Sequence, residues 1–528
     1  MRVPVGASIV RADGKALLPG FFDVHTHWSP AGRPATTPQI ASAYVSSGVT
    51  TVNDFHQQPE SFAPRRAWLR SLAAPHVNFV ARMSTPGGHG ADWGDVNTTK
   101  WVATAESARR EVRALQIYRP DYIKAFADGW RYGTQPEETS MNAETLGALV
   151  DEAHRSGQKV LTHTVTVARG KVAAAAGVDV IGHSLQDAPL DADAITAIKK
   201  AGTFYAPTLA VYEPGDPQEV RTSDAAVTQR LRKWAFAKQN LKSLYDAGVI
   251  VAVGTDAGIG GVRHGYSTLH EMELMVSAGL PAKAALMAGT ANSATALGLF
   301  EDRGTIEKGK RADLVLLDGK PWERISDVHK TDTVFIDGRA VVGGGMKLPP
   351  ANAATALAPS PAAAMIDDFE RADGRSALDT LRLADMDGGV ERSSVVTNLV
   401  PHERGRALAI AIALAPKAAP EGGIVIPLRR GSVQPVDATR YSGIRLDLRG
   451  DGPYVLVVNT LSGEWTADVA GTDRWADVRV PFTALVPVRA RSGEPRRWRG
   501  DDLLQVGLVA RRAGGTNTWA EVDNVRFF

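Results

Sequence analysis

The chain has 528 residues, of which 44% are hydrophobic and 22% are charged. This length exceeds what one core supports, so two to four domains are expected. Lys and Arg number 60 against 58 Asp and Glu, a net charge of +2, and this balance argues against a nucleic-acid partner. There are no cysteines, which excludes disulfides, thiolate metal sites and cysteine nucleophiles.

The sequence shows neither a membrane segment nor a leader. No uninterrupted apolar run is long enough to cross a bilayer, and the first residues, MRVPVGASIVRADGK, lack the apolar core of a signal peptide. As it stands, the chain is therefore predicted to be cytoplasmic. A signal peptide upstream of this start would instead imply a periplasmic or secreted protein, so that alternative stays open.

From residue 21 to about 300, short β-rich runs alternate with segments of helical apolar spacing, such as 141–157 and 225–248. The expected strands are 21–27, 49–55, 77–83, 121–127, 159–165, 178–184, 203–211 and 249–257. Eight strands separated by helices predict a TIM-like (β/α)₈ barrel over residues 21–300. The rival, an open doubly wound sheet, would need a glycine fingerprint after its first strand, and none is present.

The remainder of the chain is predicted to be mostly β. Short strands joined by glycine turns are expected over residues 301–345, and residues 1–20, before the barrel, are grouped with them through the family resemblance described below, which implies a small β-sandwich shortened at its N-terminal side. Residues 346–362 are rich in Ala and Pro and are predicted to form a linker. Over 363–528, strands without intervening helices indicate an all-β sandwich of the jelly-roll type.

Residues that can bind metals stand at the ends of the expected barrel strands, where the loops of such a barrel gather its chemistry. They are His25 and His27 on the first strand, His89 after the third, Lys124 on the fourth, His163 on the fifth, His183 on the sixth and Asp256 on the eighth. Any one histidine alone is better explained as a hydrogen-bonded core or loop residue, and Asp256 alone as a turn residue. Chance does not explain the whole set in strand order.

Lys124 lies inside the apolar run DYIKAFADG, where its ammonium group cannot reach solvent. An uncompensated buried charge is costly. This lysine is therefore expected to be deprotonated, paired or chemically modified.

The motifs LLPGFFDVHTH, DYIKAFADG, VLTHTVT, GVDVIGHS and VGTDAG, in this order, resemble the amidohydrolase superfamily. The similarity is to the branch that contains imidazolonepropionases and prolidase-like metal-dependent dipeptidases. Residues 264–317 resemble the same branch, so the resemblance covers about residues 1–345. It implies a barrel flanked by a small composite β-sandwich that is built from both ends of the domain.

The resemblance implies a site with two divalent metal ions, Zn²⁺ being favoured for a site of His and carboxylate ligands. His25, His27 and Asp256 would hold one ion, and His163 and His183 the other. Lys124, carbamylated by carbon dioxide, would bridge them. A hydroxide shared by the metals would attack a carbonyl, and Asp256 would pass its proton to the leaving nitrogen.

Four residues are candidates for substrate binding. His89 stands between glycines in STPGGHGADWG, a loop similar to the substrate-facing loop of the prolidase-like relatives, and is expected to contact substrate or oxyanion. His264 and Arg263 follow the eighth strand; they are candidates for polarising the substrate and for pairing with a carboxylate. Tyr205 could supply a hydroxyl, although a core position is an equal interpretation. The chain has HTVT after the fifth strand where the dipeptidases often have H-A-Y, so peptidase activity is one option among several.

The C-terminal segment, with MIDDFERADG and WAEVDNVRFF, resembles the domain named for complex I intermediate-associated protein 30, which has a galactose-binding-like fold. A glycan or domain contact could use its tryptophans, although core packing is the favoured interpretation for them. They are Trp465, Trp475, Trp498 and Trp519.

Three functions follow. The first is hydrolysis of an amide or peptide-like C–N bond in a small-molecule substrate. The second keeps the metal site but acts on lactones or cyclic amides. The third is a carbohydrate-binding or scaffolding protein with an inactive barrel, which is disfavoured because the ligand set is complete. A homo-oligomer is compatible with each of the three.

Overall fold

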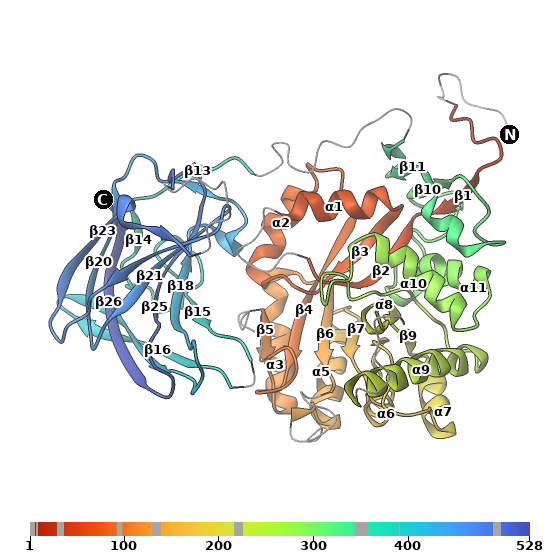
Figure 1. Cartoon of the computed structure of the whole chain (residues 1–528), viewed down its shortest axis with the longest axis horizontal. Coiled ribbons are helices and arrows are strands. Elements are labelled where there is room, and N and C mark those ends of the chain that lie inside the picture. Colours follow the sequence, from red (N-terminus) through yellow and green to blue (C-terminus); the bar gives the residue numbers. More distant parts are fainter. Residues whose placement is uncertain are drawn as a thin grey trace.

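The computed structural model describes residues 6, 9–28, 36–91, 98–128, 139–215, 225–343, 357–389, 391–488 and 498–528. Figure 1 shows a barrel with its helices, a small sheet beside it, and a separate all-β body formed by the C-terminal part of the chain. Most of the expected linker, and the start of the expected small sandwich, lie outside the described residues.

The barrel wall is a parallel sheet in the order β2-β3-β4-β6-β7-β8-β9, with β5 paired to β4. These strands are β2 (Phe21–Thr26), β3 (Val49–Asp54), β4 (His76–Ser84), β5 (Thr99–Trp101), β6 (Tyr122–Phe126), β7 (Val160–His163), β8 (Val180–Gly182) and β9 (Phe204–Ala206). Each named barrel strand except β5 overlaps an expected strand, but β7, β8 and β9 are shorter than predicted, and β9 ends five residues before the predicted residue 211. β2, β3 and β6 are buried along their whole length, as expected for parallel strands covered on both faces.

The expected eighth strand closes the barrel without forming a regular ladder. Isolated parallel bridges join Tyr205 to Val251 on one side and Thr26 to Ala257 on the other. In addition, the Val24 amide donates to the Val253 carbonyl at 2.8 Å. Gly254 occurs here because a Cβ would come within 3.0 Å of the His25 Cβ. The eighth segment is thus joined to both of its neighbouring strands by separate bridges.

Helices follow the strands and cover the barrel, as the alternating pattern predicts. They are α1 (Thr37–Ser46), α2 (Phe62–Leu69), α3 (Ala105–Leu115), α5 (Ala143–Arg155), α6 (Val167–Ala175), α7 (Ala192–Ala201), α9 (Ala225–Asp246) and α10 (Tyr266–Ser277). Shorter segments are η2 (Pro59–Ser61), η3 (Gln116–Tyr118), α8 (Leu209–Tyr212), α11 (Ala282–Met287), the π-helical η4 (Ala288–Asn292) and α12 (Ser293–Ala296). Side-chain caps fix several helix starts; for example, Asn142 accepts from the Thr145 amide at 2.8 Å before α5.

A four-stranded antiparallel sheet joins the two ends of the barrel segment, in the order β1-β10-β11-β12. β1 (Ala16–Pro19) precedes the barrel, whereas β10 (Leu314–Leu317), η5 (Ile325–His329), β11 (Thr331–Ile336) and β12 (Arg339–Val342) follow it. Across the described part of the chain, no helix has the length and apolar character that a bilayer crossing requires.

The C-terminal part forms two mainly antiparallel sheets. One contains β13 (Ser360–Pro361), β15 (Leu383–Met386), β18 (Gly422–Pro427), β19 (Val436–Asp437), β21 (Tyr454–Thr460), β22 (Glu464–Val469), β24 (Val486–Pro487) and β25 (Leu503–Ala510). The other contains β14 (Met365–Asp367), β16 (Ser394–His402), β17 (Gly405–Ala413), β20 (Gly443–Gly450), β23 (Ala476–Pro481) and β26 (Asn517–Phe527). Short turns η6 (Arg430–Ser432) and η7 (Phe482–Ala484) connect strands. We call this unit, residues 360–528, the C-terminal sandwich.

The tryptophans of the C-terminal sandwich divide into two groups. Trp465 and Trp498 are 5% and 7% exposed and belong to the sandwich core. Trp519 is 39% exposed, and Trp475 stacks on the His402 ring with centroids 4.0 Å apart. A sugar platform made of all four tryptophans is therefore wrong, and the core-packing interpretation applies to two of them.

Candidate active site

β2 and the closing segment bring three ligand-type residues together at one end of the barrel. His25 and His27 lie on and just after β2, and Asp256 stands beside the bridge that joins Thr26 to Ala257. The Asp256 carboxylate oxygen is 3.0 Å from His27 Nε2 and 3.3 Å from His25 Nε2. One donor atom from each residue lies within 4.8 Å of the others, so this trio has the spacing of a metal site.

Lys124 reaches the same group from β6. Its side chain is fully buried, and its Nζ lies 3.0 Å from His25 Nε2. The amine also sits 4.7 Å from the centre of the Phe55 ring. Burial lowers the pKa of Lys124 to about 7, although Asp256 opposes the shift. The lysine therefore stands in the barrel wall, as its apolar run predicts, with an imidazole nitrogen as its hydrogen-bond partner.

β7 and β8 place two more histidines beside this cluster. The ring centroids of His163 and His183 are 4.4 Å apart, and those of His183 and His25 are 4.5 Å apart. His89, in the turn after β4, lies with its ring centroid 4.1 Å from that of His163. The structure thus brings together all six residues predicted to bind metal, and His89 as well.

Two members of the cluster have left-handed backbone conformations. φ is +76° at His183 and +62° at Asp256, a region that residues with a Cβ rarely occupy. Such conformations cost free energy and persist only where the surrounding structure holds them. Each turns its side chain at the point where a strand ends, which the alternation of a regular strand does not predict.

The electrostatics of the site favour neutral imidazoles and an ionised aspartate. Burial lowers the pKa values of His25, His163 and His183 well below the ordinary value, and that of His89 to about 3. Burial alone would raise the pKa of Asp256, but the hydrogen bond from His27 holds this pKa below the ordinary value. Neutral rings and a carboxylate are the forms that coordinate metal ions.

The other predicted substrate residues lie in different surroundings. His264 shares a hydrogen bond of 2.8 Å with the His27 carbonyl oxygen through Nε2, so it borders the site. Gly258 permits this contact, because a Cβ there would come within 2.0 Å of that oxygen. Arg263 is exposed, with its guanidinium 3.9 Å from the Tyr266 ring centre. Tyr205 is fully buried, and its hydroxyl accepts from the Leu185 amide at 3.0 Å.

Residues that support the ligand set are the part missing from the sequence prediction. Thr208 Oγ1 is 2.9 Å from His183 Nδ1 and fixes that ring. Asp23 accepts hydrogen bonds of 2.7 Å from Thr255 and Thr268, tying β2 to the closing segment, and burial raises its pKa to about 7. Asp23 could have been found from its place two residues before His25. Thr208 follows a short strand whose end the sequence does not mark.

A second cluster, made of His76, Asp313 and Asp337, also has the spacing of a metal site. Arginines occupy its surroundings: Arg303 lies 3.6 Å from Asp313, and Arg311 lies 2.5 Å from Asp337. These cations neutralise the carboxylates, so we assign this cluster to ion pairing.

A closed parallel barrel with a buried histidine and carboxylate cluster at one end defines a barrel enzyme. The model of the amidohydrolase family matches residues 16–341, which is more than half of the chain. The chain therefore belongs to the amidohydrolase family and is a hydrolase. The C-terminal sandwich lies outside this match.

Similar proteins agree with this assignment. The imidazolonepropionase of Rubrobacter xylanophilus is 25% identical over 377 residues, covering 65% of this chain and 85% of that protein. The imidazolonepropionase of Shouchella clausii is 28% identical, but the match spans only 41% of that relative's length. Among solved structures, a Xaa-Pro dipeptidase with methionine bound in its active site is 25% identical with a TM-score of 0.54, covering 62% of this chain and 87% of that one.

Proposed function

We propose that this protein is a binuclear metal-dependent amidohydrolase that cleaves an amide or peptide-like C–N bond of a small molecule. The observation that carries the proposal is the spacing of His25, His27 and Asp256, whose donor atoms lie within 4.8 Å of one another. Lys124, His163 and His183 extend this group into one continuous buried cluster.

The donor set fits two divalent ions, with Zn²⁺ favoured by its imidazole and carboxylate ligands. His25, His27 and Asp256 would hold one ion, and His163 and His183 the other. The His163 Nε2 atom is buried and, among the described residues, has no hydrogen-bond partner. A nitrogen in this state is suited to bind a metal ion. Carbamylation of Lys124 would turn a buried amine into an anion that bridges both sites.

When bound, two such ions acidify a water molecule and polarise a carbonyl oxygen. The residues of the chain supply the remaining steps. Asp256 is held ionised beside His27, so its carboxylate can accept the proton of the attacking water and deliver it to the leaving nitrogen. His89, neutral and next to His163, would donate a hydrogen bond to the carbonyl oxygen. His264 would orient the substrate from the other side of His27.

The similar proteins suggest two classes of substrate for this site. One set of relatives is named for an imidazolone ring and the other for a dipeptide. We therefore propose to compare two substrate classes: amides or peptide-like compounds, and cyclic amides or lactones. Arg263 and Tyr205 have no place in this proposal, because the first stacks on an exposed ring and the second is bonded in the core.

The parts outside the barrel remain predictions. We propose the domain division 1–20 with 301–345, 21–300, 346–362 and 363–528, in line with the separate hydrophobic cores of the barrel and the C-terminal sandwich. A glycan contact through the sandwich would depend on Trp475 and Trp519, the two tryptophans outside its core.

Metal analysis tests the proposal. Protein purified without chelator is expected to contain about two equivalents of divalent metal per chain, and Lys124→Ala to lose most of it. Lys308→Ala, which changes an exposed lysine, is the matched control and should keep the metal. A wild-type protein without metal would refute the proposal.

Activity then separates the alternatives. A hydrolysis screen over dipeptides, N-acyl amino acids, cyclic amides and lactones is expected to yield turnover that chelator removes and Zn²⁺ restores. Turnover confined to lactones or cyclic amides would select the second alternative.

A further inference from the structure

The turn that carries His89, residues 85–91, is compact and directly joined to β4. The Gly88 amide donates to the Thr85 carbonyl at 2.9 Å, and the Ala91 amide to the Gly88 carbonyl at 3.1 Å. Ser84 Oγ donates to the His89 carbonyl at 2.8 Å. The position of His89 against His163 therefore depends on how this turn is held as a whole.

The outer end of the turn is held by the C-terminal sandwich. Arg392, two residues before β16, donates through Nη1 to the carbonyl oxygen of Ala91, two residues beyond His89. The same guanidinium lies 4.6 Å from the centre of the Trp101 ring on β5, and the Val102 amide after β5 donates to the Ser84 carbonyl at 2.8 Å. One arginine thus touches the turn and also β5, the strand that pairs with the end of β4 just before the turn.

Hydrogen bonds within the sandwich hold the backbone on either side of Arg392. Its neighbour Ser393 donates to Asp387 through both its amide and its hydroxyl, each at 2.8 Å. Lys417 donates to the Glu391 carbonyl at 3.1 Å and pairs with Asp387 at 3.0 Å. Asp387, through Ser393 and Lys417, thus holds the backbone on both sides of Arg392 and fixes the point from which its side chain extends.

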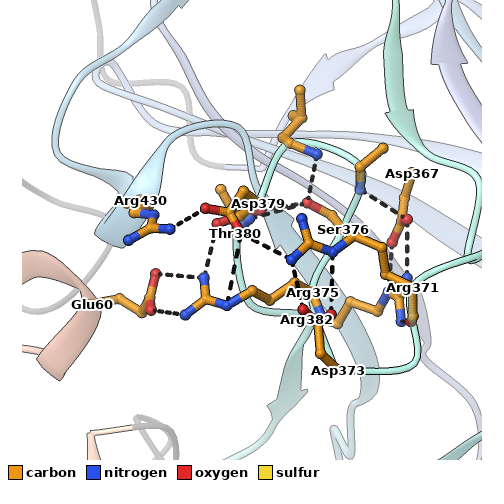
Figure 2. Close-up of polar contacts among 12 residues, drawn as sticks. Glu60, Asp367, Arg371, Asp373, Arg375, Ser376, Asp379, Thr380, Arg382 and Arg430 are labelled. Atoms are coloured by element: carbon orange, nitrogen blue, oxygen red, sulfur yellow. Dashed lines mark hydrogen bonds and ion pairs between the residues drawn. The ribbon is translucent and has the colours of Figure 1, made fainter. Parts of the chain in front are cut away.

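A second contact keeps the sandwich against the same rim of the barrel. Glu60, in η2 after β3, is buried and forms an ion pair of 2.7 Å with Arg375 of the sandwich (Figure 2). Arg375 also donates to the Asp379 carbonyl at 2.8 Å. Nearby, Gly431 has φ of +66° and approaches so closely that a Cβ would lie 2.3 Å from the Ser61 Cα. The sandwich is therefore packed tightly on the loops after β3 and β4.

We propose that Arg392 is a positioning residue of the active site: the C-terminal sandwich uses it to hold the 85–91 turn, and through that turn His89. The inference rests on the proposed function only for the role of His89. In this view the sandwich is part of the catalytic unit, and a small change on its surface alters turnover without touching substrate or metal.

The test compares Arg392→Ala and Arg392→Lys with Arg404→Ala, a change at an exposed arginine on the same sandwich. Hydrogen exchange of the 85–91 segment is the readout that needs no substrate. Arg392→Ala is expected to raise its exchange rate roughly tenfold and to lower kcat on the order of 10- to 100-fold with KM little changed. Arg392→Lys, which keeps a donor, should recover part of both, and Arg404→Ala should match wild type.

A double-mutant cycle distinguishes this route from general destabilisation. In a His89→Ala background, Arg392→Ala should lower kcat no further, because its effect passes through His89. Equal exchange and equal kcat in folded Arg392→Ala, or a full further loss in the His89→Ala background, would overturn the proposal. A wild-type protein without metal or turnover would refute the proposed function instead, and the exchange measurement would still decide whether Arg392 holds the turn.

Discussion

In the proposed function, Lys124 would be carbamylated, and its surroundings explain why. Its amine is surrounded by imidazoles and aromatic rings, a setting in which a permanent cation is costly. A lysine amine that is partly neutral near pH 7 can react with carbon dioxide, and the product would be an anion with two oxygen donors. In the proposed function, the burial that disfavours a charged lysine would also favour its conversion into this anion.

Much of the residue-level site was predictable. The histidines, Lys124 and Asp256 end strands in order, and strand ends gather at one face of a barrel. The left-handed backbones of His183 and Asp256, and the support of Thr208, were not predictable, because they arise from contacts between segments distant in sequence. For Tyr205 the sequence left a substrate-binding and a core position open, and the structure shows the core position, with the hydroxyl bonded to the Leu185 amide.

Asp385 gives a pH test far from the active site. Burial raises its pKa to about 7, and the nearby Glu421 and Glu464 add to the shift. The unfolded chain loses this proton at about pH 4, so between about pH 4 and 7 the folded state holds a proton that the unfolded state has released. The free energy of unfolding should therefore fall as pH rises through this window.

Asp385→Asn removes that dependence. We compare the free energy of unfolding at pH 8 with that at pH 5. In Asp385→Asn this difference, pH 8 minus pH 5, is expected to be roughly 1–2 kcal/mol more positive than in wild type. The effect is smaller than full burial would give, because the residue is only partly buried. Urea unfolding at both pH values measures it. Asp468→Asn, at an exposed site on β22, serves as the control. Identical pH profiles for Asp385→Asn and wild type would contradict the assignment.

At the scale of elements, the segment from β9 to α8 links the ligand set to α10. Glu271 of α10 is fully buried and accepts from the Leu209 and Ala210 amides at 2.7 and 2.8 Å, which fixes the start of α8. Thr208 directly precedes this start, with φ of +47°, and its hydroxyl meets His183. The sequence predicted a strand through 203–211, and the strand stops early because Glu271 captures these amides.

Thr208→Val tests this support. Valine keeps the branched shape but removes the hydroxyl that orients His183, so metal affinity should fall on the order of 10- to 100-fold, with folding retained. Competition with a chelator measures the change. Thr295→Val, at an exposed helical site, is the comparison. Unaltered metal affinity in Thr208→Val would show that the ring is oriented by other contacts.

At the scale of the whole molecule, the barrel order and the all-β nature of the C-terminal part were predictable from periodicity, because each element carries its own pattern. The docking of the two was not. Glu60 and Arg375 are 315 positions apart, and no sequence motif around either residue predicts that the two form a pair. Interfaces between domains depend on complementary shape and on individual residue pairs, and neither produces a periodic pattern in the sequence.

Breaking the Glu60–Arg375 pair should destabilise the whole protein. Arg375→Ala leaves Glu60 buried without a cation, although the Tyr118 hydroxyl still bonds to it, and a loss of about 3 kcal/mol in the free energy of unfolding is expected. Glu60→Gln in the same chain should recover part of the loss, because the buried charge is then gone. Arg371→Ala, which removes an exposed arginine of the same loop (Figure 2), should leave stability nearly unchanged. Urea unfolding followed by tryptophan fluorescence measures all of them, and a stable Arg375→Ala would refute the importance of the pair.

The close approach of Gly431 to Ser61 has a consequence for the evolution and engineering of this chain. A Cβ at Gly431 would lie 2.3 Å from the Ser61 Cα, so an insertion or a change of angle here is expected to disrupt the contact. A homologous module joined within the expected linker, residues 346–362, should therefore dock poorly on this barrel. A successful chimera would have to inherit η2, the 85–91 turn and η6 as a single block. The segments that would have to be exchanged together therefore lie on both sides of the boundary between the barrel and the C-terminal sandwich.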